Sequence, residues 1–464
     1  MKVRQICCIG AGFVGGPTMS VIAHECPNLK VIVVDSNLDK IKSWNSKSLD
    51  NLPVYEPGLK GIIKKTRNKN LFFSHKIDEA ILNSDIIFMA VNTPTKTSGE
   101  GKGFAADLTN VVECTKKIAL VAKSSKIIVE KSTLPVKTAE KIKEVLTLYN
   151  KETNFDVVSN PEFLAEGTAI ENLYKSDRVL IGGENTISGK KAVDAIVSIY
   201  KKWIPENKIL KTNIWSSELA KLASNAMLAQ RISSINSFSA LCEKTGASIQ
   251  EISKAIGMDS RIGPEFLEAS VGFGGSCFKK DILNLVYLAR FYGLNEVADY
   301  WHSVVKINNY QMKRFTKEIQ NKLKNINDKT ISILGWAFKK QTNDSRESPS
   351  IYVSKNLIES GANLKIYDPM VPHDKIISDL QNLFITSGYK KKQVKKLLEK
   401  IYITKSLEES LTKSSAVVII TNWDEFLNFN WENYYLKNDT KPIIFDGRNV
   451  IKNRGLDNMY SLGN

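Results

Sequence analysis

The chain has 464 residues, of which 42% are hydrophobic and 25% charged, and its formal net charge is +16. The length allows two or three domains with their own cores, and the composition is that of a globular protein rather than a disordered one. No run approaches the ~18 apolar residues of a membrane helix, and the apolar stretch 6–14 lacks the cleavage site of a signal peptide. The excess lysine is spread along the chain, so neither nucleic acid nor a membrane is expected as a partner.

Cysteine and histidine usage argues against a metal site or a disulfide framework. The six cysteines show no paired spacing, and only four histidines are present. No metal site is therefore predicted, and reduced thiols favour a cytoplasmic protein. We interpret Cys7, Cys8 and Cys242 as small buried hydrophobes, because the first two lie in an expected strand and the third lies late in an expected helix.

The N-terminal segment predicts a dinucleotide site. An expected strand over 3–9 runs into a helical pattern through the turn Gly10-Ala11-Gly12-Phe13-Val14-Gly15. We expect Gly10 to allow the tight turn, Gly12 to let a pyrophosphate approach the backbone, and Gly15 to permit close helix packing. A second expected strand, 30–34, ends at Asp35, which lies 20 residues after Gly15, where a ribose-binding carboxylate belongs.

Strands and helices continue to alternate through the first half of the chain. Further strands are expected at 71–74, 85–91, 126–130 and 156–159, and this alternation predicts a parallel, doubly wound sheet. Two of these strands end in polar turns, Asn92-Thr93-Pro94-Thr95 and Lys131-Ser132-Thr133-Leu134-Pro135. Ligands bind beyond the carboxyl ends of such strands, so both turns are expected to face the cofactor; ordinary proline-containing turns are the alternative.

A long helix is expected from about Trp215 to Gly246, because no proline or glycine interrupts the pattern before its end. At about 1.5 Å per residue it would span roughly 48 Å and bridge two domains. Lys221 and Asn225 are four residues apart and so share one face of this helix. By spacing alone, a solvent-exposed polar stripe is the favoured interpretation of the two.

Cys277 lies in a glycine-rich turn, Gly272-Phe273-Gly274-Gly275-Ser276-Cys277-Phe278-Lys279-Lys280-Asp281. Glycines let the backbone approach a ligand closely, nearby lysines favour the thiolate, and Asp281 one helical turn later can handle protons. A reactive thiol in a chain that also carries a hydride-acceptor site suggests oxidation through a covalent acyl intermediate.

The last third of the chain repeats the alternating pattern. Strands are expected at 331–334, 363–367, 416–421 and 442–445, with a helix after Ser348-Pro349. The first turn holds only Gly335, so we infer a nucleotide-type fold adapted to a different ligand. The lysine-rich segment 388–400 is expected to be an exposed insertion with a solvated helix face.

These motifs together resemble, in order and over nearly the whole chain, the animal-type UDP-glucose 6-dehydrogenases of the UDP-glucose/GDP-mannose dehydrogenase family. The segments that carry the resemblance are the glycine turn, 91–95, 130–133, 160–167, 219–225, 261–263, 272–281, 335–340 and 445–448. The resemblance implies an α/β fold with two Rossmann-like, doubly wound parallel-sheet domains joined by a long central helix. The expected domains are 1–212 for NAD, 213–325 for dimerisation and the cysteine loop, and 326–464 for UDP.

The implied reaction is a four-electron oxidation of UDP-glucose at C6 to UDP-glucuronate, with two NAD per sugar. Cys277 would add to the aldehyde, and the resulting thiohemiacetal would lose a second hydride to become a thioester. Lys221, Asn225 and Asp281 would hold the water through which the alcohol proton leaves, and Lys221 would stabilise negative charge on the C6 oxygen. Glu162 and Asp281 are candidates to activate the hydrolytic water, and Thr133 to orient it. The resemblance thus reverses the interpretation of Lys221 and Asn225 that spacing alone favoured.

The same resemblance implies two sets of binding residues. For NAD these are Gly10, Ala11, Gly12, Phe13, Val14, Gly15, Asp35, Lys40, Val91, Asn92, Thr93, Pro94, Thr95, Ser132, Thr133, Leu134, Glu166, Cys277, Lys280 and Arg346. For the nucleotide sugar they are Glu162, Phe163, Leu164, Ala165, Glu166, Lys221, Asn225, Arg261, Phe266, Phe273, Gly274, Phe338, Lys339 and Arg448.

The resemblance also implies a homo-oligomer, with a dimer as building block and hexamers among animal relatives. Arg261 is similar to a residue that enters the site from a neighbouring subunit. Two positions depart from the family pattern: Glu268 stands where a basic residue is expected beside the substrate loop, and Lys40 replaces an arginine near the adenosine ribose.

Three alternatives stay open from the sequence. A related dehydrogenase could use GDP-mannose or a UDP-N-acetylhexosamine, since those enzymes share the cysteine, lysine and asparagine. A two-electron hydroxyacid or phosphogluconate dehydrogenase also pairs a lysine and an asparagine on a helix but needs no nucleophilic cysteine. An inactive module that binds NAD and nucleotide sugars is the alternative from a different class.

Overall fold

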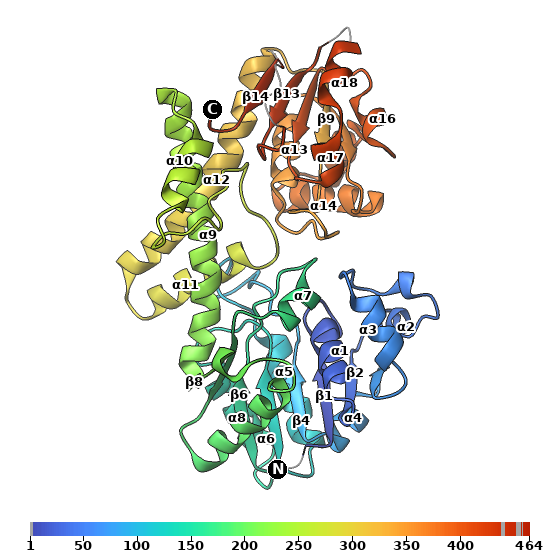
Figure 1. The fold of residues 1–464 in the computed structure, drawn as a ribbon, viewed down its shortest axis with the longest axis vertical. Coiled ribbons are helices and arrows are strands. Elements are labelled where there is room, and N and C mark those ends of the chain that lie inside the picture. Colours follow the sequence, from blue (N-terminus) through green and yellow to red (C-terminus); the bar gives the residue numbers. More distant parts are fainter. Residues whose placement is uncertain (1–2, 438–440, 452–455, 457) are drawn as a thin grey trace. The chain divides into compact units, whose positions relative to one another are not determined.

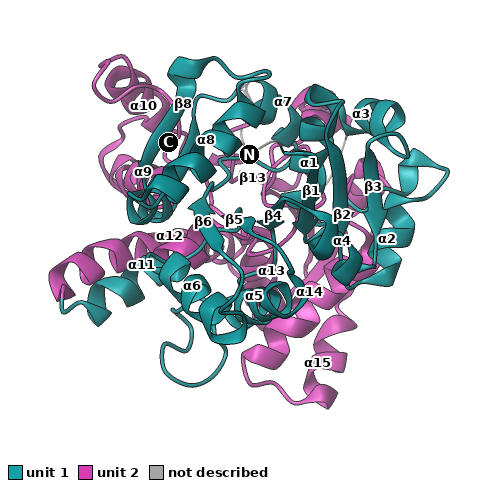
Figure 2. Cartoon of the chain, turned by 90° about the horizontal axis from the view of Figure 1, so that it is seen from below, with its two compact units in different colours: residues 1–224, 283–293 teal, residues 225–282, 294–464 magenta. Residues whose placement is uncertain are grey.

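The computed structural model describes residues 3–437, 441–451, 456 and 458–464. The chain folds into two compact units, the first made of Met1–Ser224 with Leu283–Gly293 and the second of Asn225–Ile282 with Leu294–Asn464 (Figure 2). The three-domain division expected from the sequence stays a prediction. Among the described residues, no helix combines the length and the apolar character that crossing a membrane requires.

The first unit contains an eight-stranded sheet in the order β3-β2-β1-β4-β5-β6-β7-β8. All neighbouring strands are parallel except β6 and β7, which are antiparallel. The strands are β1 (Gln5–Ile9), β2 (Lys30–Val34), β3 (Leu71–Ser74), β4 (Ile86–Met89), β5 (Lys126–Glu130), β6 (Phe155–Ser159), β7 (Val179–Gly183) and β8 (Ile209–Asn213). The first six occupy the ranges that the sequence predicted, and β7 and β8 were not predicted.

Helices cover both faces of this sheet, as a doubly wound fold requires (Figure 1). Buried residues of α1, α3, α7 and α8 pack on the face to which Cys8 points, and those of α4, α5 and α6 pack on the face to which Cys7 points. Strands that are buried on both faces appear in the sequence as continuous apolar runs, which is why these strands could be predicted. The helices are α1 (Gly15–Glu25), α2 (Leu38–Trp44), α3 (Leu59–Thr66), α4 (Ile77–Asn83), α5 (Thr109–Val121), α6 (Thr138–Tyr149), α7 (Ala169–Tyr174) and α8 (Ile187–Tyr200), with short 3₁₀ turns at Leu49–Asn51 and Glu206–Lys208.

The second unit contains a parallel six-stranded sheet in the order β11-β10-β9-β12-β13-β14. Its strands are β9 (Thr330–Leu334), β10 (Asn363–Tyr367), β11 (Ile401–Ile403), β12 (Ala416–Ile419), β13 (Ile443–Asp446) and β14 (Met459–Ser461). Its helices are α10 (Ile249–Gly257), α12 (Asn295–Leu323), α13 (Pro349–Glu359), α14 (His373–Thr386), α15 (Lys391–Leu398), α16 (Leu407–Leu411), α17 (Asp424–Asn428) and α18 (Trp431–Lys437). Two helices contribute residues to both units, α9 (Ile214–Thr245) and α11 (Phe278–Phe291).

The predicted long helix is confirmed as α9, which runs without interruption for 32 residues. The segment 388–400 has the predicted solvated helix face, since helix α15 exposes Lys391, Lys392, Lys395 and Lys396. The prediction of an exposed insertion needs a correction, because Val394 of the same helix is buried in the core of the second unit. Leu397 and Leu398 follow Val394 at helical spacing and also pack against that core, so one side of the helix is anchored.

Asp368 is the counterpart of Asp35 in the second sheet. It follows β10, the position at which Asp35 follows β2 in the first sheet. One oxygen of Asp368 accepts from the backbone N–H groups of Trp336 (2.6 Å) and Ala337 (2.9 Å) and from the Trp423 indole (3.0 Å), and the other accepts from two backbone N–H groups of the next turn. This carboxylate fixes the turn after β9, in which Trp336 and Ala337 follow Gly335, so the turn lacks the second and third glycines of a dinucleotide site.

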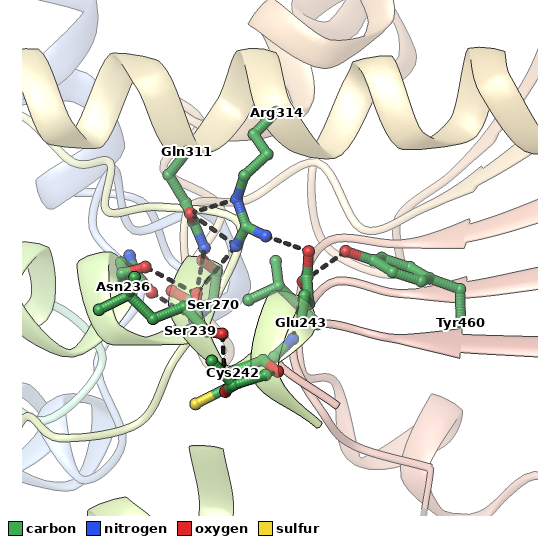
Figure 3. Close-up of polar contacts among 12 residues, drawn as sticks. Asn236, Ser239, Cys242, Glu243, Ser270, Gln311, Arg314 and Tyr460 are labelled. Atoms are coloured by element: carbon green, nitrogen blue, oxygen red, sulfur yellow. Dashed lines mark hydrogen bonds and ion pairs between the residues drawn. The ribbon is translucent and has the colours of Figure 1, made fainter. Parts of the chain in front are cut away.

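A buried polar network ties the C-terminal strand to helices α9 and α12 (Figure 3). The Glu243 carboxylate of α9 pairs with Arg314 of α12 and accepts from the Tyr460 hydroxyl (2.6 Å) and the Gly463 N–H (2.9 Å). Arg314 also donates to the Ser239 hydroxyl at 2.9 Å. Because both charged groups are largely removed from water, removing one leaves the other without its counter-charge.

We predict that Glu243→Ala lowers the free energy of unfolding by roughly 2–3 kcal/mol, between the values typical of exposed and of fully buried ion pairs. Chemical denaturation measures this change. Glu399→Ala, at an exposed glutamate of the same unit, is the matched control and should stay within about 0.5 kcal/mol of the wild type. Equal effects of the two substitutions would contradict the role given to the network.

Candidate active site

The predicted dinucleotide turn has the geometry of a phosphate-binding loop. Gly10 has φ +114°, and a Cβ there would lie 2.3 Å from the Ala90 carbonyl oxygen. A Cβ at Gly15 would lie 2.0 Å from the Gly10 carbonyl oxygen, whereas one at Gly12 would meet no atom within 4 Å. Gly10 and Gly15 are thus required by the fold, and the space at Gly12 lies at the N-terminus of α1, where phosphate charge is favoured.

Asp35 lies at the end of β2, next to this turn. Its carboxylate accepts from the Ala11 N–H (2.9 Å), the Asn37 N–H (2.9 Å) and the Lys40 ammonium (2.8 Å). Burial opposes ionisation, but the Lys40 ammonium and the two N–H groups outweigh it and hold the pKa of Asp35 below its ordinary value. The carboxylate is therefore ionised and fixed beside the glycine turn, and these residues fit an adenine dinucleotide.

The two polar turns after β4 and β5 lie side by side and are cross-linked. The Thr93 hydroxyl donates to the Thr133 carbonyl (3.1 Å), and the Ser132 hydroxyl donates to the Val91 carbonyl (2.6 Å). Leu134 is buried beneath them. These contacts place both turns at the carboxyl edge of the first sheet, where the sequence expected them.

Glu162 and Lys221 form a buried ion pair in the first unit. Lys221 Nζ lies 3.2 Å from Glu162 Oε1, and the other Glu162 oxygen accepts from the Leu164 N–H at 2.6 Å. Their side chains are only 8% and 4% exposed, so Lys221 is not part of a solvated stripe. Its ammonium also lies 5.3 Å from the Phe163 ring centroid. A buried cation of this kind can stabilise negative charge on a substrate oxygen.

Behind Glu162 lies a cavity of about 70 Å³. It is lined in part by Lys131 and Arg178, two basic residues that sequence reasoning did not single out. Arg178 stacks on the Phe163 ring with its guanidinium carbon 3.9 Å from the centroid and donates to the Ser224 hydroxyl at 3.0 Å. The Lys131 ammonium donates to Asn160 Oδ1 and the Tyr200 hydroxyl, and burial lowers its pKa to about 8. The stacking of Arg178 on Phe163 and the lowered pKa of Lys131 both result from packing between distant residues, which sequence spacing does not show.

The glycines of the Cys277 loop, in the second unit, let its backbone lie close to neighbouring residues. A Cβ at Gly274 would lie 2.6 Å from the Glu347 carbonyl oxygen, and one at Gly275, where φ is +86°, would lie 3.0 Å from the Phe338 ring. The Gly275 N–H donates to the Arg346 carbonyl (2.8 Å), and Asn308 of α12 bonds both the N–H and the carbonyl of Phe273. Asn308 belongs to α12 and not to the loop, and sequence reasoning missed it.

Cys277 immediately precedes α11, and its carbonyl accepts from the Asp281 N–H at 2.8 Å in the first turn of that helix. The thiol is half-buried and lies 3.5 Å from the Ser276 hydroxyl. Asp281 is buried, and one of its carboxylate oxygens accepts from the Asn225 amide at 2.6 Å. The helix N-terminus favours a thiolate, and a carboxylate one turn later can accept protons.

The interpretation that Lys279 favours the thiolate needs a correction. Its ammonium pairs with Glu347 at 2.7 Å and bonds the Tyr352 hydroxyl at 3.2 Å, while Tyr352 also bonds Glu347. Burial opposes the charge of Lys279, but Glu347 and Tyr352 raise its pKa above the ordinary value. Lys279 therefore anchors the start of α11 to the segment that contains Glu347. Lys280 Nζ lies 3.8 Å from Asp281.

Phe338, Lys339 and Arg448, which the family resemblance assigns to the nucleotide sugar, come together in the second unit, and their role stays a prediction. Arg448 donates to the carbonyls of Ile420 (2.6 Å) and Phe338 (3.2 Å), and the Lys339 ammonium lies 5.9 Å from the Phe338 ring centroid. Burial lowers the pKa of Arg448 to about 10, and the negative charge of Glu268 opposes that shift. The negative charge of Glu268 thus stabilises the charged form of Arg448. A basic residue at position 268 would instead repel it.

The remaining predicted residues are placed as follows. Arg261 follows α10, is 86% exposed at its side chain and pairs with Asp259. Phe266, at φ +61°, packs edge-on near Phe278, with 6.5 Å between ring centroids. The Arg346 guanidinium pairs with Asp344. Phe13, Val14, Asn92, Pro94, Thr95, Ala165 and Glu166 lie on loops in the first unit that the sequence assigned to cofactor or substrate.

Three segments match domains of one family. Residues 4–204 match the NAD binding domain of the UDP-glucose/GDP-mannose dehydrogenase family, residues 215–310 its central domain, and residues 332–453 its UDP binding domain. The UDP-glucose 6-dehydrogenase of Mus musculus is 53% identical over 97% of this chain and 90% of its own length, and UDP-glucose 6-dehydrogenase 1 of Glycine max is 51% identical over 96% and 93%. The structure of a UDP-glucose dehydrogenase from Pyrobaculum islandicum has a TM-score of 0.81 at 26% identity and covers 97% of this chain and 95% of its own.

The predicted fold class, NAD as cofactor and a nucleotide-sugar substrate are confirmed by these matches. With that fold, a dinucleotide turn at Gly10 to Gly15 and a cysteine at the start of α11, the chain belongs to the UDP-glucose/GDP-mannose dehydrogenase family as an NAD-dependent dehydrogenase.

Proposed function

We propose that this protein oxidises UDP-glucose at C6 to UDP-glucuronate and reduces two NAD per sugar. The observation that carries the proposal is the placement of Cys277 directly before α11, with Asp281 one turn later and bonded to Asn225. A two-electron alcohol dehydrogenase has no use for such a thiol. A four-electron enzyme needs a nucleophile that holds the intermediate aldehyde.

NAD, when bound at the turn around Gly12, supplies the hydride acceptor for both oxidation steps. Asp35 holds the adenosine ribose, and Lys40 keeps that carboxylate ionised through their ion pair. Thr93 and Ser132 fix the two turns that line the cofactor at the carboxyl edge of the sheet. Val91, Thr95, Leu134, Glu166, Lys280 and Arg346 complete the proposed cofactor set.

In the first step Lys221, Asn225 and Asp281 hold a water that takes the proton of the C6 hydroxyl as C6 loses its hydride. The Cys277 thiol then adds to the aldehyde: a bond forms between sulfur and C6, and the thiol proton passes to the carbonyl oxygen. Loss of the second hydride from C6 and of that hydroxyl proton gives a thioester. Lys221 stabilises the negative charge that develops on the C6 oxygen, a role suited to its burial.

Hydrolysis completes the cycle. Glu162 or Asp281 takes a proton from a water that Thr133 orients, the water oxygen bonds to C6, and the bond between C6 and sulfur breaks. The thiol regains its proton, and the acid leaves. Glu162 suits this role because its carboxylate is held by Lys221 and the Leu164 N–H, which fix its orientation.

The nucleotide end of the substrate is assigned to the second unit. Arg448 and Lys339 bring two cations to the Phe338 loop, and cations recognise phosphate oxygens. Phe273 and Gly274 belong to the cysteine loop, Phe266 lies near Phe278 of the same unit, and Phe163, Leu164 and Ala165 are assigned to the sugar. A cytoplasmic location fits six cysteines that form no disulfide.

We further propose a homo-oligomer whose dimer forms around the long helices and in which Arg261 acts on the neighbouring subunit's substrate. Large apolar side chains are exposed along α9 and α12, which is unusual for a surface in contact with water. They are Trp215, Leu219, Met227, Phe238, Leu241, Val297, Tyr300 and Tyr310. Arg261 itself projects from the chain with 86% of its side chain exposed.

The purified protein should reduce two NAD for each UDP-glucose consumed, because the thioester step requires a second hydride transfer. NADH absorbance with a limiting amount of sugar measures this ratio. Turnover only with GDP-mannose or a UDP-N-acetylhexosamine would overturn the substrate, and a ratio of one would indicate a two-electron enzyme. No NADH with any of these sugars would favour an inactive binding module.

Co-expression of Cys277→Ser and Arg261→Ala chains should restore activity that neither variant has alone. In a mixed dimer the site with intact Cys277 receives Arg261 from its partner, so random pairing restores roughly a quarter of the wild-type rate. Co-expression of two differently tagged Cys277→Ser chains is the control and should stay inactive. A mixture as inactive as that control would place Arg261 in its own subunit's site.

A further inference from the structure

Two buried carboxyl groups lie outside the proposed catalytic set. Glu130 is the last residue of β5, and Glu218 lies in the first turns of α9. They are 1% and 3% exposed. The two segments are adjacent, because Ser159 pairs with Glu130 between β5 and β6 and its carbonyl accepts from the hydroxyl of Ser217, the neighbour of Glu218, at 3.3 Å. Each carboxyl group also acts on the other electrostatically. Two carboxylates cannot both remain ionised at close range in a dry environment, so this pair must hold at least one proton.

Glu218 is built to be the ionised partner. Its Oε2 accepts from the Lys137 N–H at 2.8 Å, and its Oε1 accepts from the Ala139 N–H at 2.8 Å. Both donors belong to the start of α6, where a carboxylate is favoured by the unsatisfied N–H groups and by the helix dipole. Each oxygen of Glu218 thus accepts from a backbone donor that cannot reverse its direction.

Glu130 is built to be the protonated partner. Neither of its oxygens meets a hydrogen-bond donor among the described residues. An ionised Glu130 would be a buried charge without compensation, which is strongly unfavourable. A protonated Glu130 carries an O–H, and the Glu218 carboxylate is the acceptor next to it.

The surrounding charges agree with this assignment. Burial raises the pKa of both carboxyl groups, and Glu140 of α6 raises that of Glu218 further. Two buried cations of the same unit are engaged elsewhere: Lys131 bonds Asn160 and Tyr200, and Lys221 pairs with Glu162. The proton that the pair shares therefore stays on it well above the ordinary range of a carboxyl group.

The pair closes the ends of one loop. The loop 131–137 begins directly after Glu130 and ends at Lys137, whose N–H is bonded to Glu218. It contains Ser132 and Thr133, which join the neighbouring turn through Val91 and Thr93. Glu218 lies three residues before Lys221 on α9, so the same hydrogen bond connects this loop to the helix that carries Lys221.

We propose that Glu130 and Glu218 form a carboxyl clasp, in which Glu130 donates its proton to Glu218 and so positions the Ser132–Thr133 loop relative to Lys221 for hydride transfer. Both are positioning residues, since neither is assigned to substrate or cofactor. The part of the claim that concerns hydride transfer rests on the proposed function. The claim that the two groups share a proton, with Glu130 as donor and Glu218 as acceptor, does not rest on the proposed function.

The test compares Glu130→Gln with Glu218→Gln in the full-length protein. A glutamine at 130 is neutral and can still donate, so kcat with UDP-glucose should stay within about twofold of the wild type. A glutamine at 218 turns an N–H₂ group toward a backbone N–H, so kcat should fall about tenfold or more while KM changes much less. Glu144→Gln, at an exposed glutamate on α6 that does not act on the pair, is the matched control and should behave as the wild type.

Two readouts do not depend on turnover. The infrared band of a protonated carboxyl should be present in the wild type at neutral pH and absent from Glu130→Gln. The folded protein holds its proton longer than the unfolded chain, so the wild-type Tm should fall relative to that of Glu130→Gln as pH rises from about 5 to about 8. If UDP-glucose is not the substrate but both readouts hold, the proposed function fails and the shared proton stands.

Three results would overturn the clasp. An unchanged infrared band in Glu130→Gln would mean that Glu130 does not hold the proton. Equal losses of kcat in the two glutamine variants would remove the donor and acceptor assignment. A Glu218→Gln protein with a lowered Tm but an unchanged kcat would reduce the pair to a structural role.

Discussion

The close approach of backbone around Cys277 is the constraint on which the proposed chemistry depends. Gly274 and Gly275 lie so near the Glu347 carbonyl and the Phe338 ring that no side chain fits at either position. The loop is also bonded to Arg346 and Asn308, so it has little freedom to move. A thiol fixed at the start of a helix meets an aldehyde at the right angle without losing further conformational entropy.

The same contact joins the thiol to the residues of the second unit that we propose to bind the nucleotide. Phe338 covers Gly275 with its ring and accepts from Arg448 through its carbonyl. Under the proposed function, the binding of the phosphates by Arg448 and Lys339 determines where the sugar lies. The contact of Phe338 with Gly275 determines where the Cys277 sulfur lies. Binding energy from the remote nucleotide can then position C6, as expected of an enzyme that uses its substrate's non-reacting part for orientation.

The two sheets share a strand–turn–helix arrangement but differ in the turn after the first strand. Asp35 and Asp368 stand at matching positions and both accept from backbone N–H groups, but the turn beside Asp35 has open space at Gly12, whereas the turn beside Asp368 carries Trp336 and Ala337. The second sheet therefore keeps the architecture but not the dinucleotide site. The single Gly335 already indicated this difference in the sequence, because a turn without the second and third glycines cannot admit a pyrophosphate in the same way.

Local motifs and apolar periodicity were enough to predict most of the fold. The glycine turn, Asp35 and the strands up to β6 follow rules that act within a few residues. β8 is an edge strand with a mixed polar sequence, and β14 is only three residues long, so neither gives a clear period. Lys221 was recognised as part of a site only through the family resemblance, because its pairing with Glu162 joins residues 59 positions apart. The partners Lys279 with Glu347 and Glu130 with Glu218 were missed for the same reason.

The central claim is that the sugar becomes covalently bound to Cys277 as a thioester. Glu162→Gln should slow hydrolysis more than oxidation, so rapid acid quench of this variant with NAD and UDP-glucose should trap the adduct. Mass spectrometry of the digested protein should then find the nucleotide-linked acyl group on the peptide that contains Cys277. A full burst of NADH without any adduct on that peptide would contradict the account.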